Sequence, residues 1–353
     1  MTFGTKSRTT PAAKYTCSQG FTSWLHDHHV SLAFSTRQLG KLFFVGLQPD
    51  GRLSITERTF DRATGLCVRH DGVRLTLWMA SLYQIWRFEN VLKEGRDHAG
   101  FDALFVPQVG FTTGNLDVQA LDTDVAGRIL FVSRLFSCLA TTTESHNFTP
   151  LWKPSFISKY AAEDRCHLSG MTTAEGRPIF VTAAAASDTA RGWHDQRVNG
   201  GIVINCQNDE TVASGLSLPC APRLYRNTLW LLNAGSADFG RVSLETGTFE
   251  NLTHCPGLLR GLSFFEDFAI VTTSQPNDSS TLVDMPVETQ SGKCQLSIID
   301  LRTFEIVHWL RFEGLINELH DVVALPRITR PMALGFESSE IQRTLSIDET
   351  KTQ

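Results

Sequence analysis

The sequence predicts an all-β protein, most specifically a β-propeller with six blades of mainly four antiparallel strands. Three observations support this prediction. Short runs of β-branched and aromatic residues recur along the chain, most of their starts lie roughly 40–50 residues apart, and long helical patterns are nearly absent. One four-stranded sheet cannot bury both of its faces, whereas a closed ring of such sheets buries a continuous core.

Each of the six runs is too short for a helix and fits a buried strand. They occupy residues 42–45, 75–78, 129–132, 179–182, 229–232 and 269–272, and most follow a turn signal containing Gly or Asn. Further strands are expected at 51–59, 82–88, 200–206 and 240–244. A weaker segment at 316–325 is expected to complete the ring with N-terminal residues. The alternative fold, a pair of β-sandwiches, does not require this long period.

The remaining chain is assigned to loops and tails. Residues 28–336 are predicted to form one propeller domain, residues 1–27 an N-terminal segment that is partly disordered, and residues 337–353 a polar tail. Three stretches rich in small polar residues, 141–150, 186–199 and 275–293, are expected to be loops. Residues 159–164 are expected to form one or two helical turns.

Composition excludes several classes of protein. The chain has 353 residues, of which 42% are hydrophobic and 20% charged, and its net charge is −5. An acidic chain without a basic patch is not expected to bind nucleic acid. It contains no apolar run long enough to span a membrane, and its polar N-terminus lacks the apolar region of a secretory signal. Eight scattered cysteines without a Cys-x-x-Cys pair favour reduced thiols. We therefore expect a cytoplasmic protein without membrane contacts.

Several stretches resemble a bacterial family of conserved hypothetical proteins that carries a domain of unknown function and is predicted to form β-propellers. The matching stretches occur in the family's order. They are 35–42 (STRQLGKL), 84–88 (QIWRF), 152–158 (WKPSFIS), 163–170 (EDRCHLSG), 192–193 (GW), 200–201 (GG), 229–233 (LWLLN) with Gly235, 260–262 (RGL) and 318–322 (ELHDV). The resemblance implies a propeller and implies no established activity.

The chain departs from this family pattern at three places. Gln119 stands where the family has His, Cys220-Ala221 where it has His-Ser, and Ser169 where it has Asn. Chemistry that relies on those imidazoles is therefore not expected here, and the chain combines the family's scaffold with an altered site.

Comparable positions in successive repeats give the candidate site. Gln119, His167, Cys220 and Arg260 each precede a core run by about the same interval, which places them near the start of an inner strand. Glu318 and His320 are expected to take the same place in the last segment. Inner strands line the central channel, so these residues are expected to converge on one axial site.

The candidate roles follow from side-chain chemistry. His167 is a candidate acid or base, Arg260 a clamp for an anion or carbonyl group, and Glu318 its carboxylate partner. Gln119, Cys220 and His320 are candidate ligand contacts, and Trp193, in the longest mid-chain loop, could cap a pocket. Each also has a structural interpretation: His167 as a locally bonded core residue, Cys220 as a small apolar residue, and Arg260 as the ion-pair partner of Glu318.

Three functions remain open at this level. They are binding of a small-molecule metabolite in an axial pocket, catalysis as a propeller enzyme (lyase, isomerase, cyclase or hydrolase), and service as a protein-interaction scaffold. No protease, α/β-hydrolase, P-loop or dinucleotide-binding motif is present. The cofactor is undetermined, with a divalent metal as one possibility; the tract His26-Asp27-His28-His29 suggests metal by composition, although its spacing is too tight for one ion.

Overall fold

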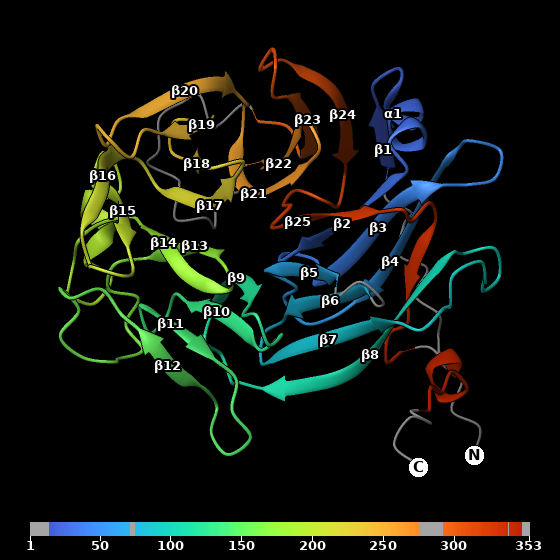
Figure 1. The fold of residues 1–353 in the computed structure, drawn as a ribbon, viewed down its shortest axis with the longest axis horizontal. Coiled ribbons are helices and arrows are strands. Elements are labelled where there is room, and N and C mark those ends of the chain that lie inside the picture. Colours follow the sequence, from blue (N-terminus) through green and yellow to red (C-terminus); the bar gives the residue numbers. More distant parts are fainter. Residues whose placement is uncertain (1–13, 71–74, 276–291, 338, 348–353) are drawn as a thin grey trace.

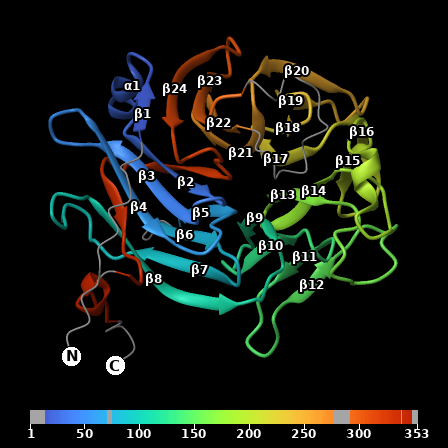
Figure 2. The same cartoon turned by 180° about the vertical axis from the view of Figure 1, so that it is seen from behind.

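A computed structural model describes residues 14–70, 75–275, 292–337 and 339–347. It contains six largely antiparallel sheets arranged in a ring around a common axis (Figures 1 and 2). The predicted six-bladed β-propeller is therefore confirmed. We number the blades 1 to 6 in the order of their outer three strands along the chain.

Blades 2 to 6 are each built from consecutive strands, which run from the axis outward. Blade 2 contains β5 (Leu66–His70), β6 (Leu75–Ala80), β7 (Gln84–Asn90) and β8 (Ala103–Thr112). Blade 3 contains β9 (Val118–Thr123), β10 (Ile129–Ser133), β11 (Cys138–Thr141) and β12 (Thr149–Trp152). Blade 4 contains β13 (Leu168–Ala174), β14 (Arg177–Ala183), β15 (Gly201–Asn205) and β16 (Thr211–Leu216).

The last two of these blades follow the same plan. Blade 5 contains β17 (Pro219–Tyr225), β18 (Thr228–Asn233), β19 (Asp238–Val242) and β20 (Phe249–His254). Blade 6 contains β21 (Leu258–Phe265), β22 (Phe268–Ser274), β23 (Gln295–Asp300) and β24 (Ile306–Glu313).

Blade 1 closes the ring with strands from both ends of the chain. Its inner strand, β25 (Val322–Pro326), pairs with β2 (Val30–Thr36), which is followed outward by β3 (Lys41–Leu47) and β4 (Leu53–Thr59). Two further strands extend neighbouring blades: β1 (Lys14–Cys17) pairs with β24 of blade 6, and β26 (Pro331–Ala333) pairs in parallel with β8 of blade 2. The segment expected to complete the ring does so.

Hydrophobic clusters lie between the blades and hold the ring together. One cluster joins each neighbouring pair, for example Phe44 of blade 1 with Phe105 of blade 2, whose rings stack with centroids 5.4 Å apart. Five of the six predicted core runs are the second strand of a blade, where both faces are buried. The first run, at 42–45, lies instead on the third strand, β3. This offset explains why the first interval in the sequence is the shortest.

Short helical segments differ from the expectation. The structure forms no helix at 159–164, so that prediction was wrong. An α-helix, α1 (Phe21–Asp27), lies instead in the N-terminal segment, where Phe21, Trp24 and Leu25 pack into the cluster between blades 1 and 6. Two 3₁₀ segments are described, η1 (Gly192–Gln196) and η3 (Ser339–Gln342). No helix among the described residues is both long and apolar enough to cross a membrane. The predicted loop at 275–293 lies mostly outside the described residues.

Candidate functional site

Polar side chains gather where the inner strands begin, at one end of the propeller axis. We call this group the axial site; its members surround two small adjoining cavities. The first cavity is lined by Gln119, Ala120, Arg134, Ser169, Cys220, Ala221, Arg223, Arg260, His320 and Asp321. The second shares Ser169, Cys220 and Arg260 with the first and adds His167. Each cavity leaves only about 20 Å³ for water-sized groups.

The structure brings together most of the residues predicted for an axial site. Gln119, Cys220 and Arg260 lie on inner strands β9, β17 and β21. His167 and His320 lie just before inner strands β13 and β25. The common register of these positions in the sequence therefore corresponds to one end of the axis.

Glu318 and Trp193 lie beside the cavities and line neither of them. Glu318 is half-buried in the connection before β25, and its side chain has no hydrogen bond or ion pair with any described residue. The predicted pair between Glu318 and Arg260 is not formed. Trp193 lies in η1 and is buried against His167, with ring centroids 3.8 Å apart.

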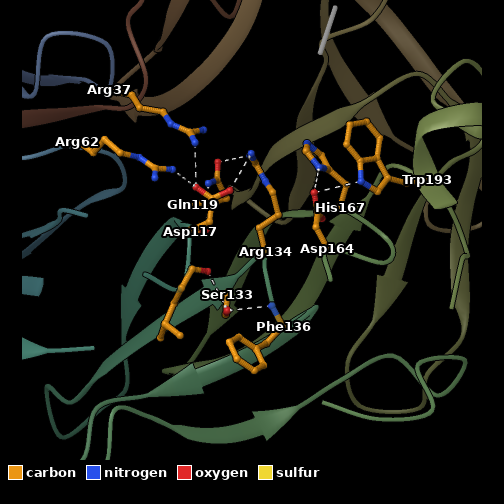
Figure 3. Close-up of polar contacts among 11 residues, drawn as sticks. Arg37, Arg62, Asp117, Gln119, Ser133, Arg134, Phe136, Asp164, His167 and Trp193 are labelled. Atoms are coloured by element: carbon orange, nitrogen blue, oxygen red, sulfur yellow. Dashed lines mark hydrogen bonds and ion pairs between the residues drawn. The ribbon is translucent and has the colours of Figure 1, made fainter. Parts of the chain in front are cut away.

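Asp117 collects three arginines at the rim of the site (Figure 3). Its carboxylate lies 3.2 Å from Arg37, 2.8 Å from Arg62 and 3.4 Å from Arg134. Burial alone would raise the pKa of this carboxyl, but the charges of Arg134, Arg37 and Arg62 outweigh burial and hold it below its ordinary value. One carboxylate therefore pairs with three cations. Glu318 also attracts Arg62 and Asp164 attracts Arg134, but with Arg223 and Arg260 the cations of the site still outnumber its carboxylates.

Gln119 takes part in the same network. Its amide oxygen accepts a hydrogen bond from Arg134, and its amide nitrogen donates to the backbone oxygen of Asp117 at 3.0 Å. A neutral amide accepts from Arg134 without titrating. Gln119 therefore acts as a fixed, non-titrating acceptor for Arg134. Burial lowers the pKa of Arg134 to about 10, although Asp117 opposes this shift, so its guanidinium remains charged at neutral pH.

His167, Asp164 and Trp193 form a second polar group (Figure 3). The Oδ2 atom of Asp164 accepts hydrogen bonds from Nδ1 of His167 at 2.9 Å and from Nε1 of Trp193 at 3.1 Å. This contact fixes the ring orientation and assigns the proton of the neutral ring to Nδ1, which leaves the Nε2 lone pair free to act as a base. Burial, followed by the charge of Arg134, lowers the pKa of His167 to about 4, so the imidazole is neutral at pH 7.

Arg260 and His320 are the members of the axial site that lack partners. Nε of Arg260 and both ring nitrogens of His320 are buried without a hydrogen bond among the described residues. The guanidinium of Arg260 also forms no ion pair with any residue that the structure describes. Native proteins leave few buried polar atoms unsatisfied, and those that remain call for an explanation such as a ligand or water.

Two further side chains set the electrostatics of the first cavity. Burial raises the pKa of the Cys220 thiol to about 11, which makes Cys220 unsuitable as a nucleophile at neutral pH. Burial also raises the pKa of Asp321 to about 6, although Arg223 and the backbone N–H groups of Leu66 and Val322 oppose this shift. Asp321 is therefore mostly ionised at pH 7 and becomes neutral in mild acid.

Three residues near the site share a left-handed backbone conformation. Asp117, Asp164 and His167 all have left-handed backbones, with φ of 49°, 44° and 53°. Non-glycine residues adopt this region uncommonly, although Asp and His tolerate it better than most. Other turns of the described chain, such as those at Ala99, Glu175 and Asn227, also have left-handed backbones, so this conformation alone does not mark the site. In the described part of the chain, no three His, Cys, Asp or Glu side chains come together as a metal site requires.

The sequence reasoning missed seven charged residues of this region, of which Arg223 lies on β17 and Asp321 directly follows His320. Arg37 and Arg134 lie in turns between the second and third strands of their blades, whereas Arg62, Asp117 and Asp164 lie in connections between blades. A usable signal existed for these two aspartates, because Asp117 precedes Gln119 by two residues and Asp164 precedes His167 by three. Arg37, Arg62 and Arg134 carry no such local signal, because they lie in turns and connections that are far apart in the sequence.

Comparison with known proteins identifies a family but no activity. A family model described as "Domain of unknown function (DUF4915)" matches residues 19–334. A search of curated proteins found no match to this chain.

Solved structures similar to the chain support the fold. The structure titled "Crystal structure of Nidogen/Laminin Complex" aligns with a TM-score of 0.53 and 12% identity over 84% of this chain and 99% of that one. TolB from Acinetobacter baumannii aligns at 0.48 and 14%, over 85% and 67% of the two chains. Virginiamycin B lyase from Staphylococcus aureus aligns at 0.39 and 12%, over 86% and 100%. Identities this low show the fold alone, and of these three only the first exceeds a TM-score of 0.5.

Proposed function

Because the chain belongs to the DUF4915 family, whose function is not defined, we propose from its own residues that it binds a small anionic metabolite at the axial site. The observation that carries this proposal is the unpartnered guanidinium of Arg260 beside the first cavity. Arginine presents a planar fork of donors that matches a carboxylate or phosphate, and such charge-assisted hydrogen bonds are the strong ones.

The surrounding charges support an anion. Arg37, Arg62 and Arg134 share the single carboxylate of Asp117, so the local balance is positive before any ligand binds. A low-dielectric site in which positive charges predominate attracts anions.

The size of the cavities limits what enters. About 20 Å³ holds roughly one water molecule. The part of the ligand that enters one cavity is therefore about one oxygen atom of an anionic group, while the rest of the metabolite lies outside the cavity.

Calorimetric titration with acetate, succinate, phosphate and sulfate tests this proposal. Sulfate and phosphate stabilise proteins non-specifically, so the heat of binding is a better readout than a thermal shift. We expect saturable binding of at least one of these anions. Arg260→Gln should weaken it about 10- to 100-fold, the range for a lost hydrogen bond between charged groups.

The matched control is Arg241→Gln. Arg241 lies on β19, the third strand of blade 5, where its half-exposed side chain pairs with Glu250 at 2.6 Å and lines neither cavity. This variant should bind anions like the wild type. Equal binding by the wild type and Arg260→Gln would refute the assignment of Arg260.

A second candidate function, an enzyme that transfers a proton, is favoured by the pair Asp164–His167. A neutral imidazole oriented by a carboxylate is the usual arrangement of a general base. His167 would remove a proton from carbon next to a carboxylate held by Arg260, which is the first step of many lyase and isomerase reactions. Among the described residues, Glu318 has no hydrogen bond or ion pair that supports its assigned part in this chemistry.

The enzyme hypothesis is tested by incubating small carboxylic acids with the protein in D₂O. NMR then monitors the exchange of their carbon-bound hydrogen for deuterium. We expect exchange with the wild type and with the control His254→Asn. His254 lies on the outer strand β20 and pairs with Asp238. His167→Asn should reduce the exchange at least 100-fold, because general-base catalysis contributes about that much. Unchanged exchange in this variant would eliminate His167 as the base.

A further inference from the structure

His320 occupies a position that neither a packing role nor the anion clamp explains. Its side chain lines the first cavity and is only 6% exposed, yet neither ring nitrogen has a hydrogen-bond partner among the residues that the structure describes. Its backbone is held firmly, because its N–H donates to the oxygen of Ser35 at 2.8 Å. The buried ring thus lies beside the cavity with two unused polar atoms.

The groups around His320 are predominantly cationic. The charged and titratable groups that face it are Arg37 from the turn after β2, Arg134 from the turn after β10, Asp117 before β9, Cys220 and Arg223 from β17, Arg260 from β21, and Asp321 beside it in the chain. Burial, followed by the charges of Arg260, Arg37 and Arg134, lowers the pKa of this imidazole well below its ordinary value. The free protein therefore holds a neutral ring here at pH 7.

An anion in the cavity reverses this balance. A neutral imidazole has one donor and one acceptor, and an acceptor lone pair that faces an oxyanion is repulsive. The protonated ring instead has two donors. An anion bound at Arg260 also cancels part of the positive charge that disfavours the protonated ring, and a nearby opposite charge raises the pKa of an imidazole.

We propose that the axial site binds its oxyanion together with a proton, which is held by His320. This inference rests on the proposed anion binding at Arg260 and adds how that binding depends on pH. No bond is formed or broken: one proton moves from solvent to the ring, and the ring donates a hydrogen bond to the anion.

The coupling has a measurable consequence. By thermodynamic linkage, a group that gains a proton when the ligand binds makes the affinity rise as pH falls. Between pH 8 and pH 6 we expect the affinity to rise by up to about tenfold per pH unit. The steepest part lies between the pKa values of His320 in the free and bound states.

Calorimetry with sodium sulfate on the full chain tests the proposal. Sulfate keeps its charge over this pH range, so any proton exchange belongs to the protein. Titrations at pH 7 in Tris and in imidazole, two buffers that contain no oxyanion and differ in ionisation heat, give the number of protons taken up. We expect close to one proton per sulfate for the wild type and for the control His254→Gln.

His320→Gln separates the alternatives, because glutamine keeps polar atoms at this position but cannot be protonated. We expect the variant to bind sulfate more weakly and without proton uptake. Sulfate binding by the wild type without proton uptake would overturn this inference and leave the anion site intact. Undiminished uptake in His320→Gln would overturn the assignment of the proton to His320. Failure of every anion to bind would overturn the proposed function itself. The buffer comparison on the wild type is decisive even if the variant does not fold.

Discussion

At the scale of single residues, the charge of Asp117 affects both the stability of the fold and the attraction of the axial site for anions. Its carboxylate is 18% exposed and contacts Arg37, Arg62 and Arg134. Removing one partner from a largely buried ion pair leaves uncompensated charge, which is strongly destabilising. The same uncompensated charge attracts an anionic ligand. Stability and affinity should therefore change in opposite directions when Asp117 is neutralised.

Asp117→Asn tests this opposition. Asn tolerates the left-handed backbone at this position, so the change is mainly one of charge. We expect the free energy of unfolding to fall by about 3 kcal/mol and the affinity for sulfate to rise several-fold. Urea unfolding and calorimetry measure the two quantities. A parallel loss of both would mean that Asp117 positions the arginines rather than balances them. The control Asp50→Asn alters an exposed carboxylate paired with Arg52 and should change neither quantity.

At the scale of elements, glycines let the inner strands approach one another at the axial site. A Cβ atom on Gly261 of β21 would lie 2.7 Å from the Cα atom of Asp321. On Gly170 of β13 it would lie 2.9 Å from the backbone nitrogen of Ala221. These distances are too short for any real contact, and the obstacles belong to the next blade: backbone atoms for Gly261, and both the Pro222 ring and backbone for Gly170. The absent side chains therefore bring Arg260 and His320 to the same cavity.

Gly261→Ala should push β21 away from the segment before β25. Extra volume in a packed site costs about 1–3 kcal/mol, and we expect that loss in urea unfolding together with weaker sulfate binding. Gly335→Ala is the control, because its added Cβ would lie at an ordinary 3.4 Å from the side chain of Arg58. Wild-type sulfate affinity in Gly261→Ala would show that the strand spacing does not control the site.

Some of these elements could be predicted from the sequence and others could not. The recurring apolar runs predicted the number of blades, because the second strand of a blade is buried on both faces and reads as a continuous apolar stretch. Helix α1 was not predicted, because it has only seven residues and its apolar residues Phe21, Trp24 and Leu25 make too short a helical pattern. The starts of inner strands were predictable from their register. The arginines of the turns were not, because only the closed ring brings residues such as Arg37 and Arg134 together.

At the scale of the whole molecule, closure in blade 1 joins the two ends of the chain. Five residue pairs link β2 to β25, from Val30 with Pro326 to Phe34 with Val322. The hydrophobic clusters between blades continue across this seam, so each blade has a packed neighbour on both sides. A ring of this kind is expected to unfold as one cooperative unit.

A chain ending at residue 320 tests the role of closure, because it lacks β25 and β26. We expect its urea unfolding to lose cooperativity, because blade 1 then exposes β2 and the cluster residues Leu325 and Ala333 are missing. Tryptophan fluorescence and circular dichroism measure the unfolding. A chain ending at residue 347 keeps every described element and should unfold like the wild type. A sharp transition in the shorter chain would show that the ring is stable without its seam.

The outer strands β1 and β26 protect the closing pair of strands, β2 and β25, when the chain is pulled. Each is the fifth strand of its sheet, one on either side of blade 1, so the blade that hosts it retains four strands without it. A cellular unfolding machine that pulls on either end of the chain would first peel away β1 or β26. The pairing of β2 with β25 carries load only after that outer strand has been stripped. The fold thus places an expendable strand between each chain end and the contact that keeps the ring shut.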